Sequence, residues 1–208
     1  MNQMVLKNSK ISIKEAQKIV ALNYDIKGSI EKLDGEIDFN FKVQSTKGKN
    51  YLLKISRPNF ESDYIDFQIK LLDHLNKNCE IEIAENKLTI GGNKSCIVKD
   101  NLGRDRSVRL LTWTEGRLWS SVNPINQSLR MKLGSNTAIL DRSLFNFKHS
   151  FSKREIEWDI SNSLWVEDHV DKFDANQKII LTKFILDFKR NLTLYNDLPK
   201  SIIHNDIN

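Results

Sequence analysis

The pattern of apolar residues changes once along the chain, near residue 113, and this change limits the folds open to it. Before that point, alternating or continuous apolar residues predict short β-strands over 29–33, 39–43, 51–55 and 107–113. After it, apolar residues recur at helical spacing from Pro124 to Tyr195. Strands followed by helices indicate an α+β fold with two lobes. We expect a first lobe over 1–113, a short hinge at 114–116, and the first part of a helical lobe over 117–208.

Two helices and a hairpin complete the predicted first lobe. Ser12 and Glu15 have capping-box spacing at the start of a helix over 12–22. Apolar residues on one face predict a second helix over 63–75. A glycine pair at 91–92 predicts a turn between strands over 81–90 and 95–99.

The composition is that of an ordinary globular protein, with 39% apolar and 28% charged residues. The net charge of +5 comes from basic residues that form no cluster longer than a pair, so a nucleic-acid partner is supported only by the isoelectric point of about 9.1. No apolar run is long enough for a membrane span or a signal peptide. The two cysteines lack metal-ligand spacing, and free thiols indicate a reducing compartment. We therefore expect a cytoplasmic protein with no nucleic-acid and no membrane partner.

One lysine stands inside an apolar strand segment. Lys54 lies between Leu53 and Ile55 in YLLKI, and a lysine in a strand that is buried on both faces is costly unless an anion pairs with it. The alternative is an edge-strand lysine whose ammonium group reaches water. A helix that carries Asp66 and Gln68 follows about a dozen residues later. Kinase-like folds hold nucleotide phosphates with a strand lysine that is braced from the next helix.

The chain ends with a second candidate, His204-Asn205-Asp206. In isolation these three polar residues indicate a surface loop. Their position after a strand lysine, a helix and a helical lobe matches the order in kinases, where a loop aspartate orients the acceptor hydroxyl and takes its proton. Asp206 fits that role. A turn over 34–38 offers backbone N–H groups to a phosphate, although an ordinary hairpin turn gives the same pattern.

Together these segments resemble the aminoglycoside-phosphotransferase superfamily, most closely its hydroxylysine-kinase-like branch. The motifs that carry the resemblance over 12–208 are LDGEIDFNF, YLLKIS, DFQIKLLDHL, VRLLTWTEGRLW, WDISNSLWVEDHVD and IIHNDIN. The resemblance implies a protein-kinase-like fold that uses ATP or GTP and Mg²⁺ to phosphorylate a hydroxyl of a hydroxylysine-like amino alcohol or an aminoglycoside-like acceptor. Some members of the branch are fused to a class-III aminotransferase, so such a fusion partner is a further expectation.

The resemblance also implies roles for single residues. Lys54 matches the family's phosphate-binding lysine. Gln68 falls where the helix partner of that lysine stands, with Asp66 two residues before it, and which of the two pairs with Lys54 stays open. Asp206 matches the catalytic aspartate, and His204 matches the structural histidine of the same loop.

Two further segments are assigned to the nucleotide by the resemblance. The hinge whose backbone hydrogen-bonds the adenine matches Thr112, Trp113 and Thr114. The loop over the phosphates matches Gly35, Glu36 and Asp38.

The family's metal-binding residues would follow the end of this sequence. Its metal-binding asparagine comes about five residues after the catalytic aspartate, whereas Asn208 is the last residue here. We therefore expect an N-terminal fragment that carries no metal ligand and is inactive alone. The alternative hypothesis is a non-catalytic kinase-like module that binds a nucleotide or a partner.

Overall fold

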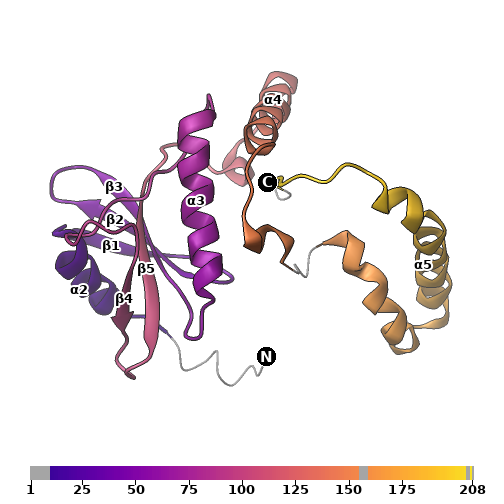
Figure 1. The fold of residues 1–208 in the computed structure, drawn as a ribbon, viewed down its shortest axis with the longest axis horizontal. Helices are drawn as coiled ribbons and strands as arrows, with labels where there is room; N and C mark the ends of the chain where they lie inside the picture. The colour runs from indigo at the N-terminus through magenta and orange to yellow at the C-terminus, as the bar shows by residue number, and fades with distance from the viewer. Residues whose placement is uncertain (1–9, 155–158, 205–206, 208) are drawn as a thin grey trace. The chain divides into compact units, whose positions relative to one another are not determined.

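The computed structural model describes residues 10–154, 159–204 and 207, which form two compact units (Figure 1). The smaller unit covers 152–201 and contains the 3₁₀ helix η3 (Ile160–Lys172) and helix α5 (Ala175–Asn196). None of the helices in the described ranges is long and apolar enough to cross a membrane. The predicted lobe boundary at 114–116 stays a prediction.

A five-stranded antiparallel sheet forms the centre of the larger unit (Figure 1). The strand order is β1-β2-β3-β5-β4, so β3 is the central strand. Neighbouring strands keep their side chains in rows, and alternate rows face opposite sides of the sheet. The strands are β1 (Gly28–Leu33), β2 (Phe39–Ser45), β3 (Asn50–Ile55), β4 (Cys96–Lys99) and β5 (Asp105–Thr112).

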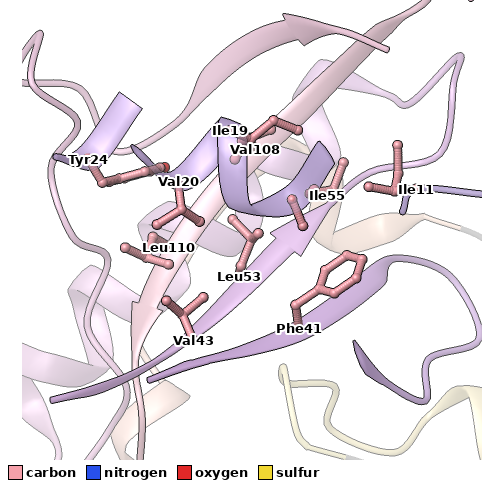
Figure 2. Packing of buried hydrophobic residues seen from close by; sticks show 11 residues of the cluster. Ile11, Ile19, Val20, Tyr24, Phe41, Val43, Leu53, Ile55, Val108 and Leu110 are labelled. Carbon is pink, nitrogen blue, oxygen red and sulfur yellow. The ribbon is translucent and has the colours of Figure 1, made fainter. Parts of the chain in front are cut away.

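Helix α2 (Ile13–Tyr24) covers one face of this sheet and closes the hydrophobic core (Figure 2). The helix begins at the predicted capping box of Ser12 and Glu15. Burying each large apolar side chain contributes about 1.5–3 kcal/mol, so this core fixes which strand residues face α2. The sheet residues in the core are Phe41, Val43, Leu53, Ile55, Val108 and Leu110.

Helix α3 (Ser62–Asn78) lies on the opposite face of the sheet. Arg109 stands between two core residues of β5 and therefore points away from α2, and it donates a hydrogen bond to Gln68 of α3. On its other side α3 packs against the segment after α4 (Gln127–Leu144). There the ring of Phe67 lies 5.9 Å from Phe147 and 6.3 Å from Phe151, centroid to centroid.

The predicted α+β class, with a strand-rich part followed by helices, is confirmed. The predicted hairpin between 81–90 and 95–99 is wrong. Residues 96–99 form β4, which pairs with β5, and residues 85–87 hydrogen-bond the same edge of β5 further along, at Leu110 and Thr112. Strand β5 is longer than β4, so the backbone groups of β5 that extend beyond β4 need other partners. Residues 85–87, which belong to the segment predicted to pair with 95–99, supply these partners.

A buried ion pair closes the β4–β5 end of the sheet. The side chains of Arg106 and Asp100 are 0% and 3% exposed and approach to 2.6 Å. Burial opposes the charge of Asp100, but hydrogen bonds from Arg106, Arg104 and the backbone of Leu102 outweigh it and hold the pKa of Asp100 well below its usual range. Arg106 also donates to the carbonyl of Ser56 at 3.0 Å, which ties this end of the sheet to β3.

We expect Asp100→Asn to lower the free energy of unfolding by about 3 kcal/mol, because it leaves a buried guanidinium without its counter-ion. The exposed pair of Lys99 and Asp105 gives a matched control, in which Asp105→Asn should cost less than about 1 kcal/mol. Urea unfolding at pH 7 measures both.

The pH dependence adds a second readout for Asp100. A carboxylate whose pKa is lowered by folding stabilises above its unfolded pKa of about 3.9, and this stabilisation is lost as the pH falls toward the folded value. The deficit of Asp100→Asn should therefore narrow below about pH 4. Equal effects of the two asparagine substitutions at pH 7 would contradict the role given to the buried pair.

Candidate functional site

Three polar side chains form one row across the face of the sheet that α3 covers. Lys54 on β3 is the register partner of Asn40 on β2 and of Arg109 on β5. Asn40 Oδ1 accepts a hydrogen bond from Lys54 Nζ at 3.1 Å. Residues opposite each other on antiparallel strands have Cβ atoms about 4.5–5.5 Å apart, and like charges in that position repel. Lys54 and Arg109 therefore need a counter-ion close by.

The carboxylate of Asp38 supplies that counter-ion. Its Oδ2 lies 3.3 Å from Lys54 Nζ and 3.9 Å from Arg109 Nη2. The side chains of Asp38 and Arg109 are 9% and 3% exposed, whereas that of Lys54 is 23% exposed. One carboxylate thus serves two cations, and Lys54 is the cation that solvent can reach.

The turn that carries Asp38 is held tightly against the sheet. Asn40 Nδ2 donates to the carbonyl of Asp34 at 3.3 Å. A Cβ atom at Gly35 would collide with the Asn40 side chain and with the Asp38 carbonyl, so the turn requires a glycine at this close approach.

Glu36, the third residue predicted in this loop, takes part through its backbone. Its carbonyl accepts a hydrogen bond from Arg57, which follows β3. The loop is therefore anchored both to the row of polar side chains and to the end of the lysine strand.

Asp66, one of the two residues predicted to brace Lys54, bonds to other partners. Its carboxylate lies 2.7 Å from Lys70 and 2.9 Å from His149. Hydrogen bonds from these two groups, that of Lys70 first, hold the pKa of Asp66 below its usual range. Asp66 therefore joins α3 to the segment after α4, not to the lysine.

Gln68, the other candidate partner of Lys54, reaches the row through Arg109. Its Oε1 accepts a hydrogen bond from the guanidinium group. A glutamine gives Arg109 an acceptor without adding a negative charge. Arg109 was not predicted as a site residue, although it is a charged residue within the apolar run SVRLLTW and could have been found by that signal.

The segment predicted to hydrogen-bond the adenine begins at the last residue of β5. The backbone N–H of Thr112 donates to the Glu85 carbonyl at 2.9 Å, and its Oγ1 accepts from the Glu85 N–H at 2.8 Å. Lys42 Nζ lies 4.6 Å from the centre of the Trp113 ring. Trp113 directly continues the ladder between β5 and β3, so its backbone N–H points to the β3 edge. Among the described residues, the backbone N–H of Thr114 makes no hydrogen bond to another backbone group, which leaves it for a ligand.

The predicted catalytic residue Asp206 lies outside the described residues. His204, two positions earlier, is described, and its backbone N–H donates to Asp141 Oδ1 of α4 at 3.3 Å. Among the described residues, no group of three His, Cys, Asp or Glu side chains is arranged to hold a metal ion.

Solved structures identify the proteins that share this fold. The microcompartment-associated aminopropanol kinase matches with a TM-score of 0.72 at 17% identity over 94% of this chain. Amicoumacin kinase hAmiN, in complex with AMP-PNP, Ca²⁺ and Ami, matches with a TM-score of 0.68 at 19% identity over 97% of this chain. The chain has a kinase-like fold.

A third kinase-like structure, an aminoglycoside phosphotransferase from Alicyclobacillus acidocaldarius, matches with a TM-score of 0.54 at 13% identity over 92% of this chain. The chain spans 62%, 58% and 55% of the lengths of these three solved chains, in the order given. No family model and no curated protein matches the sequence. At these identities the likeness establishes the kinase-like fold alone, and the predicted hydroxylysine-kinase-like branch stays a prediction.

Hydrogen exchange tests the backbone hydrogen bonds assigned at the end of β5. Without a ligand we expect the amide of Thr114 to exchange at nearly the rate of an unstructured peptide, because it has no backbone acceptor among the described residues. The amide of Thr112, which is bonded to Glu85, should exchange at least about tenfold more slowly. Exchange of the two amides at one rate, read by NMR, would contradict the assigned hydrogen bonds.

Proposed function

We propose that this protein is a phosphotransferase, or part of one, that uses ATP or GTP to phosphorylate a hydroxyl of a small amine. The observation that carries the proposal is the partly exposed ammonium group of Lys54, which shares a single carboxylate with the buried cation of Arg109. A positive charge remains after Asp38 is counted, and such a site attracts an anion. The kinase-like fold favours a nucleotide phosphate as that anion.

Each part of the nucleotide has a candidate partner in the chain. Lys54 binds the phosphates as a compact point charge, which is the usual role of a strand lysine in this fold. The backbone N–H of Thr114, which has no backbone partner among the described residues, is the candidate hydrogen-bond donor to the base. The turn over 35–38, which the sheet holds beside Lys54, flanks the phosphates.

The transfer step is assigned to Asp206 by its motif. The acceptor oxygen attacks the terminal phosphorus, the bond to the nucleoside diphosphate breaks, and the hydroxyl proton passes to the Asp206 carboxylate. His204, which belongs to the same motif, is held to α4 by the hydrogen bond from its backbone N–H to Asp141 Oδ1.

Two features of the proposed reaction, the metal ion and the acceptor, are inferred from other kinases. Kinases use Mg²⁺ to neutralise the phosphates, but the described residues do not form a metal site, so no step is assigned to a metal here. The small hydroxylated amine is the proposed acceptor because two of the matching kinases are named for aminopropanol and amicoumacin. The predicted aminotransferase fusion gains no support from these structures.

A coupled assay of nucleotide consumption tests the proposed function. The protein expressed from its complete gene is incubated with ATP or GTP, Mg²⁺ and a panel of hydroxylated amines. Turnover that depends on one class of acceptor supports the proposal. Nucleotide binding without turnover of any acceptor would favour a non-catalytic kinase-like module.

We expect Lys54→Met to lower kcat/KM for the nucleotide at least about a thousandfold, because it removes the charge that binds the phosphates while keeping an apolar side chain of similar length. Lys70→Met is the matched control, since Lys70 lies exposed on α3 against Asp66, and its kcat/KM should stay within about twofold of wild type. Turnover retained by Lys54→Met would refute the role of this lysine.

A further inference from the structure

We propose that Asp38 and Arg109 position Lys54, and thereby replace the helix glutamate that serves the lysine in protein kinases. In those enzymes the strand lysine pairs with a glutamate on the following helix. Here α3 presents Gln68, which bonds to Arg109, and the carboxylate comes from the turn between β1 and β2. This inference rests on the proposed function and names two residues that support its central lysine.

Arg109 explains why the carboxylate comes from the turn. It is 2% exposed and lies directly opposite Lys54 on the central part of the sheet. Burial lowers the pKa of Arg109, and the negative charge of Asp38 opposes that shift. Asp38 therefore stabilises the buried cation, and the two cations fix the carboxylate from two sides. The uncharged Gln68 accepts a hydrogen bond from Arg109 without drawing it away from Asp38.

The residue that contacts the nucleotide differs from the two residues that position it. Arg109 is too deeply buried to touch a ligand, and a carboxylate at Asp38 repels a phosphate. Neither residue therefore binds the nucleotide directly. Lys54 makes the contact, and Asp38 with Arg109 determines where its ammonium group stands.

The rate at which the Lys54 amine is chemically labelled reports on its contact with Asp38 without any nucleotide. Acetic anhydride modifies amines, and mass spectrometry gives the rate at Lys54 relative to the exposed Lys18. In Asp38→Asn the amino group of Lys54 loses the carboxylate that holds it against the sheet, so it becomes more accessible to the reagent and labelling should rise about fivefold. Asp66→Asn makes the same chemical change at a carboxylate that does not contact Lys54, and the Lys54 rate, compared with that of wild type, should stay constant.

A carboxylate placed on α3 by Gln68→Glu should compensate for the carboxylate that Asp38→Asn removes. Gln68→Glu alone should slow the labelling of Lys54, because it adds a second negative charge to the same row. Combined with Asp38→Asn, it should return the rate toward that of wild type. The second readout is titration with AMP-PNP, where Asp38→Asn should weaken binding about tenfold and the double variant should recover part of that loss.

The outcomes separate this inference from the proposed function. Unchanged Lys54 labelling in a folded Asp38→Asn variant, or failure of Gln68→Glu to alter the rate in either background, overturns the positioning role. Absence of AMP-PNP binding by the wild-type protein overturns the nucleotide site, whereas the labelling still decides whether Asp38 holds Lys54. Circular dichroism shows whether each variant is folded.

Discussion

The carboxylate of Asp38 between Lys54 and Arg109 is the interaction on which the candidate site depends. Two cations opposite each other on neighbouring strands repel, and a single carboxylate at 3.3 Å from one and 3.9 Å from the other offsets that repulsion. Because Arg109 is buried and Lys54 is partly exposed, the unbalanced charge is presented to solvent by the lysine. The proposed anion-binding role of this face follows from that asymmetry.

The hydrophobic core makes this arrangement of charges possible. The packing of α2 on one face of the sheet fixes which residues of β2, β3 and β5 point inward, and the alternation of the strands then sends Asn40, Lys54 and Arg109 to the other face. A slip of one residue in register would bury the charges under α2 and expose the core. The ion pair of Asp100 and Arg106 ties the β4–β5 hairpin to the end of β3, and so supports the register from the far end of the sheet.

Local patterns predicted most of the fold, and they failed where partners were distant in the chain. The capping box at Ser12, the alternation in β2 and the apolar run in β3 are local signals, and the helix and strands that they predicted are present. The hairpin over 81–99 failed because the edge of β5 selects its neighbours by tertiary pairing. Lys54 could be predicted as a site residue because it is a charged residue within an apolar strand segment. Its partner Asp38 could not be distinguished from Asp66 or Gln68, since the choice depends on how a turn folds back over the sheet.

The central claim is that the ammonium group of Lys54 meets the phosphates of a nucleotide. Its most direct measurement is an NMR titration of the protein with AMP-PNP, in which the lysine side chains carry ¹³C at Cε and the Lys54 signal is assigned by Lys54→Met. The account predicts a saturable shift of the Lys54 signal while the signal of Lys70 stays in place. A Lys54 signal that does not move while AMP-PNP binds elsewhere, or that moves no more than the signals of exposed lysines, would contradict it.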